Sequence, residues 1–483
     1  MKLNNVLFSR VDNSALVLFR AFFGLLIMLE AWGAIATGWV RRIFVDPDFT
    51  FNFIGFDFLQ TFPGTGLQMY VYFVIMGIFG YMVMVGYKYR FAIIGYAIMW
   101  SAVYFMQKTA YNNHYYLLML LLWIMALLPA HTSFSFDAKK NPAIRDQSMP
   151  RWVPILIIAQ LWIVYTYASI AKIYPDWLDG TATRLLMQGR KEYWLIGDLL
   201  QLPWVPWVVA YVGILFDGLV IPALLWKKTR KWAFGISIFF HLFNSIVFQI
   251  GIFPYMSLAF TLFFFPSEVI HRIFLKGKKQ EKTRRIFLCI SQKSKLFFYP
   301  LKAVSYIVLR GKTLKPYYDG KQEMRLPKLR TVGIIVIGAY LILQIALPSR
   351  HRFIQDDVLW TEEGHRLSWR MMLRTKGGAT YFTVLDKATQ KKTTVKLHEY
   401  LSKRQLRTIR TKPDVIWQFA QRLKKEYAEK GQDVAVFASC RVKVNGRKLR
   451  RLIDPKVDLT TVSWNPWGHT EWVLDSEDYL DKE

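Results

Sequence analysis

Residues 15–36 read ALVLFRAFFGLLIMLEAWGAIA, and this stretch decides the fold class. It is apolar over a length that suits an α-helix crossing the hydrocarbon core of a bilayer, which takes about 20 residues. The run is too long for the hydrophobic part of a secretory signal peptide, contains Arg20 and Glu30, and is not followed by a small-residue cleavage site. We therefore expect a first transmembrane helix that remains in the protein.

Further apolar segments follow along the chain. They are Met69–Tyr87, Phe91–Phe105, Tyr115–Leu128, Trp152–Ile170, Val205–Trp226, Trp232–Ile250, Phe253–Phe265 and Val332–Leu347. The segment Phe253–Phe265 is short enough to be re-entrant or tilted instead of a full span. Together these segments predict a membrane α-helical bundle of about eight or nine transmembrane helices.

The composition agrees with a membrane protein. Of the 483 residues, 53% are hydrophobic and 20% are charged, whereas soluble domains carry about 25% charged residues. So much apolar surface excludes a disordered chain. The formal net charge of +30 indicates basic loops beside anionic membrane lipid. Nucleic-acid binding is the alternative, but no basic stretch forms a recognisable nucleic-acid module.

The basic loops predict how the chain is oriented. They are residues 87–90, 139–151, 227–231 and 266–331, and basic loops stay on the cytoplasmic side. With a cytoplasmic amino terminus, all four loops lie on the cytoplasmic side of the cell (inner) membrane, and the carboxyl-terminal part lies on its outer side. Cys289 is then inside and Cys440 outside, so the two cannot form a disulfide.

We expect four regions from these patterns. Residues 1–265 form a transmembrane helical catalytic domain, 266–331 a basic cytoplasmic loop, 332–347 the last transmembrane helix, and 348–483 a carboxyl-terminal α+β extramembrane domain. In that domain, TYFTVL and TTVKL alternate like two strands around a polar turn. Residues 413–430 have the pattern of an amphipathic helix, and Asn445-Gly446 is a strong hairpin signal. A scaffold without chemistry is the alternative for this domain.

Several polar side chains lie inside the apolar segments. Ionisable groups in membrane helices are candidates for function by default. Arg20 and Glu30 are about 15 Å apart along one helix, so each needs a partner on another helix. His241 and Asn244 share one helix face. They are candidates for the wall of a ligand pocket, and a structural hydrogen bond or ion pair is the alternative for all four.

Two motifs stand at the outer ends of adjacent helices. The first, QKTAYNNHYY, contains Lys108, Asn112, Asn113 and His114. The second, YASIAKIYPDW, contains Lys172, Tyr174, Asp176 and Trp177. A short inner loop joins the two helices, so we expect them to run antiparallel and to bring the motifs together. A desolvated lysine near a histidine and amides is a candidate base, although a lysine at a helix end often only snorkels. The sequence has no metal-ligand motif and no nucleotide fingerprint.

These motifs resemble the vitamin K-dependent γ-glutamyl carboxylase family over nearly the whole chain. The resemblance includes FRAFFGLLIMLE (residues 19–30), KTAYNNHYY, AKIYPDW and HLFNSIVFQIGIFPY (residues 241–255). It continues in the outer domain with WTEEGHRLSWRMM (residues 360–372) and LIDPKVDLTTVSWNPWGHTEW (residues 452–472). Several long motifs in the family's order are highly specific.

The resemblance implies a coupled reaction. Vitamin K hydroquinone, or menaquinol in a bacterial-type member, is deprotonated and reacts with O₂. The resulting strong base removes a γ-proton from Glu in an exported protein or peptide, and the carbanion takes up CO₂. The products are γ-carboxyglutamate and the quinone epoxide. In this reading Lys172 is the base, His114 is the catalytic histidine, and Asn113 supplies a hydrogen bond beside it. Such chemistry needs a dry pocket.

The remaining candidates would line the quinol pocket. They are Asn112, Lys108, Arg20, His241, Asn244, Tyr174, Asp176 and Trp177. No metal is expected. The chain departs from the animal enzymes at three positions, where it has Gln107, Ala171 and Arg370, and it lacks their disulfide.

Two other functions stay open at this point. One is a quinol epoxidase or oxygenase that carboxylates nothing, and the other is a non-catalytic quinone-binding scaffold. The basic residues of the outer domain suit a Glu-rich substrate, or they only solvate the domain and touch anionic lipid. They include Arg447, Lys448, Arg450 and Arg451.

Overall fold

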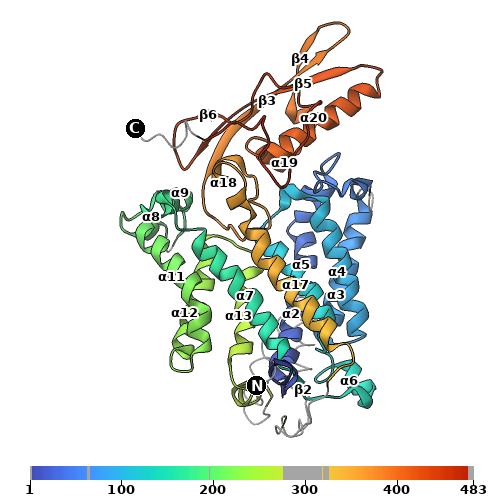
Figure 1. Cartoon of the computed structure of the whole chain (residues 1–483), viewed down its shortest axis with the longest axis vertical. Coiled ribbons are helices and arrows are strands. Elements are labelled where there is room, and N and C mark those ends of the chain that lie inside the picture. Colours follow the sequence, from blue (N-terminus) through green and yellow to red (C-terminus); the bar gives the residue numbers. More distant parts are fainter. Residues whose placement is uncertain (1–2, 62–65, 195, 276–317, 319–325, 477–483) are drawn as a thin grey trace.

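The computed structural model describes residues 3–61, 66–194, 196–275, 318 and 326–476. Most of the predicted basic loop 266–331, including Cys289, lies outside these residues. Within them the chain forms a helical bundle with a small α+β domain at one end (Figure 1). The fold class predicted from the sequence is therefore confirmed.

Each predicted transmembrane segment is a helix. The long helices are α2 (Ser14–Ala36), α3 (Leu67–Val85), α4 (Tyr89–Met106), α5 (Asn113–Leu127), α7 (Trp152–Ile170), α11 (Val205–Leu225), α12 (Arg230–Val247) and α17 (Arg330–Ser349). The predicted segment 253–265 is α13 (Phe253–Phe260), continued by the 3-10 turn η5 (Thr261–Phe264). Six helices of the described residues are long and apolar enough to cross a membrane, namely α2, α3, α4, α7, α11 and α17.

The helices follow one another around the bundle. Neighbouring pairs are α5 and α4, α4 and α3, α3 and α2, α2 and α13, α13 and α12, α12 and α11, α11 and α7, and α7 and α17. The closest crossing is between α2 and α3. There, a Cβ added at Gly24 would lie 2.2 Å from the backbone nitrogen of Met84. Small residues at such crossings let membrane helices pack backbone to backbone.

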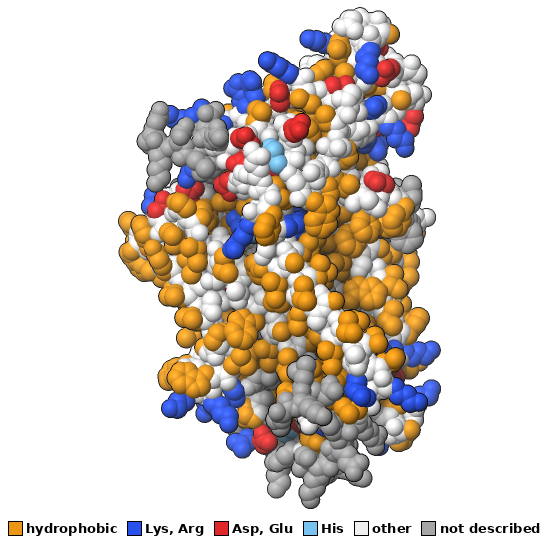
Figure 2. Space-filling view, viewed as in Figure 1, with side chains coloured by type: hydrophobic (Ala, Val, Ile, Leu, Met, Phe, Trp, Pro, Cys, Tyr) orange, Lys and Arg blue, Asp and Glu red, His pale blue; other side chains and the backbone are white. Residues whose placement is uncertain are grey.

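The outside of the bundle is apolar. Side chains such as Phe91, Leu219, Phe239 and Ile342 are more than half exposed. Figure 2 shows hydrophobic side chains across the middle of the visible face, with Lys and Arg near both ends. This is the distribution expected where a bilayer surrounds a protein and its charged ends meet water.

Helix α17 is held to the bundle by polar groups as well as by packing. The amide of Gln344 donates to the hydroxyl of Tyr116 on α5 at 3.3 Å and accepts from Gln160 on α7 at 3.4 Å. The hydroxyl of Tyr340 donates to Gln160 at 2.6 Å. Such interhelical hydrogen bonds persist in lipid, where water does not compete for the same groups.

The outer domain has a four-stranded antiparallel sheet with the order β4-β3-β5-β6. Its strands are β3 (Lys376–Asp386), β4 (Lys392–Thr394), β5 (Val434–Val444) and β6 (Arg450–Arg451). The helix α20 (Pro413–Ala428) packs against β5, and α19 (Lys403–Ile409) precedes it. The predicted strands and amphipathic helix are present, and the Asn445-Gly446 turn has positive φ at both residues.

The membrane domain contributes side chains to the hydrophobic core of the outer domain. Phe51, in the loop between α2 and α3, is buried in the same hydrophobic cluster as Phe382, Phe419 and Val436 of the outer domain. The side-chain amide of Gln405 donates to the backbone oxygen of Phe49 in that loop at 2.7 Å. The two domains therefore pack through a shared core.

Short elements complete the described chain. They are α1 (Leu3–Phe8), β1 (Arg10–Asp12), η1 (Arg41–Val45), η2 (Asp57–Thr61), η3 (Lys108–Ala110), α6 (Phe136–Lys140), η4 (Pro142–Ile144), β2 (Ser148–Pro150), α8 (Pro175–Leu178), α9 (Thr181–Gln188), α10 (Gly197–Leu200), α14 (Ser267–Ile270), η6 (His271–Leu275), η7 (Arg350–Phe353), α18 (Val358–Thr361) and η8 (Leu397–Glu399). Strands β1 and β2 pair antiparallel and tie the amino terminus to the start of α7.

Candidate functional site

Lys172 lies just beyond the end of α7 and is buried. Its Nζ donates to the carboxylate of Asp217 on α11 at 2.6 Å and to the backbone oxygen of Ala168 at 2.9 Å. The lysine and aspartate side chains are 10% and 9% exposed. The indole ring of Trp177 covers the amine, with its centroid 5.7 Å from Nζ, and donates to the backbone oxygen of Ala210. The predicted lysine therefore has an acidic partner in a largely apolar place.

A second polar pair lies deeper in the bundle. The hydroxyl of Tyr165 on α7 is 3.0 Å from Nε2 of His241 on α12. The rings of His241 and His114 both contact the ring of Phe253, with centroids 6.0 Å and 4.4 Å from it. The two histidines therefore share one aromatic neighbour.

His114 lies in the first turn of α5, among aromatic rings. Its ring stacks on that of Phe253, with centroids 4.4 Å apart. Nδ1 of His114 and Nδ1 of His241 are buried, and neither has a hydrogen-bond partner among the described residues. Asn244, by contrast, donates to the backbone oxygen of Phe240 in its own helix at 3.0 Å.

The first motif lines a cavity of about 450 Å³ between α5 and the outer domain. Lys108, Asn112, Asn113 and His114 all reach it. We call it the cationic cavity, because its lining includes Lys108, Arg366, Arg370, Arg404, Arg407 and Lys412. Among the described residues that line it, the only carboxylate is Glu362.

Two buried carboxylates form ion pairs with three of these cations. Asp414, in the first turn of α20, pairs with Lys108 at 2.7 Å and with Arg366. Burial alone would raise the pKa of Asp414, but the charges of Arg366 and Lys108 lower it below the ordinary value. Burial also lowers the pKa of Lys108 to about 8. The carboxylate of Glu362 binds Lys412 at 2.5 Å, and burial lowers the pKa of Lys412 to about 7.

The asparagines of the first motif have distinct roles. The Asn112 side chain caps α5 by accepting from the backbone nitrogen of Tyr115 at 2.7 Å. The Asn113 amide donates to the backbone oxygen of Arg370 at 2.8 Å and accepts from the hydroxyl of Tyr111 at 2.7 Å. Asn113 therefore binds the outer segment that faces His114.

Tyr174 and Asp176 of the second motif lie in a different cavity, of about 560 Å³. The carboxylate of Asp176 pairs with Arg447 and accepts from the amide of Asn445 at 2.9 Å. The Tyr174 hydroxyl donates to the backbone oxygen of Leu373. These residues dock the outer domain beside Lys172. The sequence offered two roles for Arg447, which were binding of a Glu-rich substrate or contact with solvent and lipid. In the structure, Arg447 instead forms a contact between the two domains.

The two motifs bind one segment of the chain but line different cavities. Asn113 and Tyr174 bind the backbone of residues 370–373, and Arg370 lines both cavities. The 360–372 motif, which leads into this segment, is wound tightly. It has positive φ at Glu362, Gly364, Leu367, Trp369 and Met372. The ring of Trp369 stacks on Tyr116 of α5 at 4.8 Å.

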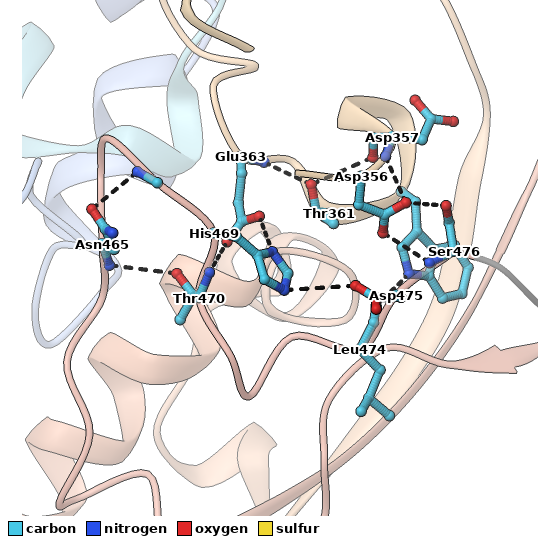
Figure 3. A network of polar contacts seen from close by, with 12 residues as sticks. Asp356, Asp357, Thr361, Glu363, Asn465, His469, Thr470, Leu474, Asp475 and Ser476 are labelled. Atoms are coloured by element: carbon cyan, nitrogen blue, oxygen red, sulfur yellow. Dashed lines mark hydrogen bonds and ion pairs between the residues drawn. The ribbon is translucent and has the colours of Figure 1, made fainter. Parts of the chain in front are cut away.

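A polar network anchors the start of the 360–372 motif to the 452–472 motif near the carboxyl terminus (Figure 3). Glu363 accepts from the backbone nitrogen of Thr470 at 2.9 Å and lies 2.9 Å from Nδ1 of His469. The other ring nitrogen of His469 is 3.7 Å from Asp475. Burial raises the pKa of Glu363. Through Glu363, His469 and Thr470, this network joins the 360–372 motif to the 452–472 motif.

Arg20 does not reach this site. Its guanidinium is fully buried and donates to the backbone oxygens of Phe134, at 2.6 Å, and Ala130, at 3.4 Å. These carbonyls follow the far end of α5, which is about 20 Å along the helix from His114. Glu30 meets Tyr115 on α5. A partner on another helix was predicted for both ionisable residues of α2. Glu30 has one, but the partners of Arg20 are backbone oxygens in the connection between α5 and α6.

Sequence reasoning missed Asp217 and Tyr165. Asp217 was detectable, because it is an acid in the apolar run GILFDGLVIPALL and the rule applied to Arg20 and Glu30 applies to it equally. The cations of α19 and Lys412 gave no such signal, since basic residues are ordinary on a water-exposed helix. Within the described residues, no group of three or more His, Cys, Asp or Glu side chains could hold a metal ion.

Comparison with known families covers nearly the whole chain. Residues 8–268 match the family model described as HTTM domain, and residues 329–479 match the vitamin K-dependent gamma-carboxylase, lumenal domain. No solved structure matches the chain. The first match and the apolar helices identify a multi-pass membrane protein. With both matches in this order, the chain belongs to the vitamin K-dependent γ-carboxylase family.

Proposed function

We propose that this protein is an integral membrane γ-glutamyl carboxylase. It would oxidise a vitamin K-type hydroquinone with O₂ to the epoxide and carboxylate protein-bound Glu with CO₂ to γ-carboxyglutamate. One observation carries the proposal. The motif that holds the buried amine of Lys172 and the motif that lines the cationic cavity both bind the backbone of residues 370–373. The family membership supports the same reaction.

The interior near Lys172 and His114 suits a reduced quinone. It combines aromatic rings, such as Phe216 and Phe253, with buried ring nitrogens of His114 and His241 that lack partners among the described residues. When bound, vitamin K hydroquinone or menaquinol supplies the electrons that reduce O₂ and, through that reaction, a base strong enough to remove the γ-proton of Glu. Lys172 receives the quinol's proton, and the surrounding apolar side chains exclude water.

His114 and Asn113 prepare the other side of the reaction. The free Nδ1 of His114 can accept from or donate to a reacting oxygen at the edge of the cavity. Asn113 holds residue 370 in place through its hydrogen bond to the backbone. The arrangement keeps Arg370 at the mouth of the site.

The cationic cavity suits the acidic substrate. Arg404 and Arg407 are exposed on α19, and cations lining a cleft raise the local concentration of carboxylates. We propose that a Glu-containing exported protein or peptide binds here, with its side chain directed toward His114. The outer domain would then lie outside the cell (inner) membrane, where such substrates are found, and the amino terminus would be cytoplasmic.

The direct test uses purified protein in nanodiscs with reduced vitamin K, labelled CO₂, O₂ and a Glu-containing peptide. We expect wild type to form quinone epoxide and labelled peptide, and Lys172→Ala to lose both. Lys228→Ala removes an exposed lysine from the α11–α12 connection and is the matched control, with unchanged products expected.

Other outcomes distinguish the remaining candidates. Epoxide without labelled peptide, for a range of Glu-containing peptides, would identify a quinol epoxidase or oxygenase. Neither product from folded protein that binds the quinol would contradict the proposal and favour a quinone-binding scaffold. The cationic cavity favours carboxylation over epoxidation alone, because epoxidation needs no binding site for an acid.

A further inference from the structure

We propose that Asp217 is the positioning residue for the base, so that Asp217 and Lys172 accept the quinol's proton as one unit. The inference rests on the proposed function of Lys172 and deepens it. In the simpler view, an isolated neutral amine is the base. The geometry points to a pair, because the Nζ of Lys172 is 2.6 Å from Asp217 and also donates to Ala168.

The Lys172–Asp217 pair is packed between α7, α11 and the ring of Trp177. Asp217 is on α11, which packs along α7, and Lys172 directly follows α7. A Cβ at Gly213, one turn before Asp217, would lie 3.8 Å from both the Lys172 side chain and the Trp177 ring. With the indole over the amine, the ammonium and carboxylate are held together and away from water.

The groups facing the pair do not replace either partner. Tyr165 on α7 is hydrogen-bonded to His241 of α12, and Ser169 on α7 donates to the backbone oxygen of Ile214. On α8, the carboxylate of Asp176 is already bound to Arg447 and Asn445. Asp217 is therefore the carboxylate that balances the charge of Lys172.

This arrangement changes where the proton goes. A buried ammonium bonded to a carboxylate already has three protons on nitrogen. A proton of Nζ first passes to the oxygen of Asp217, which leaves a free electron pair on the nitrogen. When the O–H bond of the quinol breaks, its proton forms a new bond to that electron pair. The products are quinolate, ammonium and carboxylic acid, and the electron pair of the O–H bond stays on the quinol oxygen. Lys172 remains a cation beside the new anion, which it stabilises.

Asp217→Asn separates the two views. Asparagine keeps the shape but removes the carboxylate, and a buried ammonium without a counter-ion is strongly disfavoured. The variant therefore holds Lys172 as a neutral amine. If the amine alone is the base, epoxide formation is retained or rises. If the pair is the base, we expect the rate to fall roughly 10²-fold to 10⁴-fold, the usual contribution of a general base.

Two further variants distinguish loss of the carboxylate's role in proton transfer from a structural effect of the Asp217→Asn substitution. Asp217→Glu keeps a carboxylate, and we expect it to regain at least about tenfold in rate over Asp217→Asn, which is about 1.4 kcal/mol in barrier. Asp198→Asn removes an exposed carboxylate and should leave the rate unchanged. Equal rates for Asp217→Asn and wild type, or no recovery in Asp217→Glu, would overturn the proposal.

A spectroscopic measurement tests the pair without turnover. Infrared difference spectra are recorded as reduced vitamin K binds to the protein without O₂. We expect a protonated-carboxyl band that shifts in D₂O, and that is absent in Asp217→Asn although the quinol binds. Quinol binding to wild type without this band would contradict the pair as proton acceptor. A wild type that gives the band but forms no product would instead contradict the proposed function.

Discussion

At the scale of single residues, Asp414 has the largest expected effect on stability. It is the shared anion of Lys108 in the membrane domain and Arg366 in the outer domain. Asp414→Asn would leave the buried Lys108 and the partly buried Arg366 without their carboxylate, and loss of one partner from a buried pair costs about 3–5 kcal/mol. We expect a clearly lower thermal unfolding temperature in detergent, as measured by tryptophan fluorescence.

Asp433→Asn is the matched control for that change. Its carboxylate binds Lys387 at 3.0 Å, and the two side chains are 71% and 42% exposed. Exposed pairs contribute about 0–1 kcal/mol, so this variant should unfold like wild type. Equal unfolding temperatures for the two variants would show that Asp414 does not organise the buried cations.

The lysines of the cationic cavity predict a pH dependence. Burial lowers the pKa of Lys412 to about 7 and that of Lys108 to about 8. Both ammonium groups therefore lose their protons as pH rises through these values, while the arginines stay charged. At saturating quinol, we expect the KM for a Glu-containing peptide to increase from below pH 7 to above pH 8.

Lys412→Arg isolates this effect. Arginine retains its charge across that range, so the increase in KM with pH should be smaller in the variant than in wild type. A wild-type KM that is constant from below pH 7 to above pH 8 would mean that these lysines do not attract the substrate.

At the scale of elements, the α2–α3 crossing depends on one glycine. A Cβ at Gly24 would lie 2.2 Å from the backbone nitrogen and 2.4 Å from the Cα of Met84. Because backbone atoms are the obstacle, the helices must separate to accommodate alanine. We expect Gly24→Ala to lower the unfolding temperature and to increase proteolysis of the bundle.

Gly33 provides the comparison within the same helix. No atom lies within 4 Å of a Cβ added there, and alanine favours a helix over glycine by about 1 kcal/mol. Gly33→Ala should therefore unfold at the wild-type temperature or slightly above it. A Gly24→Ala protein as stable as Gly33→Ala would disprove the close crossing.

At the scale of the whole molecule, the proposed orientation can be tested in intact cells. Lys392 on β4 and Lys139 on α6 are both exposed and lie at opposite ends of the molecule (Figure 1). Each is replaced by cysteine in a protein whose two native cysteines are alanine. We expect a membrane-impermeant maleimide to label Lys392→Cys only, with both sites labelled after lysis. Labelling of Lys139→Cys alone would reverse the orientation.

The helices and much of the outer domain could be predicted from the sequence, because each depends on local patterns. The segment Trp152–Ile170 is identical in prediction and structure, since a polar residue or turn ends the apolar run at both sides. The site was only partly predictable. Lys108, Asn112, Asn113 and His114 are adjacent in the chain and reach one cavity, but Arg20 lies elsewhere, because its position in α2 is toward the opposite end of the bundle.

The sequence by itself determined that this protein crosses a membrane, has a carboxyl-terminal α+β domain, and carries the motifs of its family. Those properties follow from apolar length, periodicity and residue order, which are local. Only the tertiary structure decided that Lys172 is paired with Asp217, 45 residues away in the chain, and that Asp414 joins Lys108 to Arg366. Such pairs depend on which helix faces meet, and that is set by packing across the whole bundle.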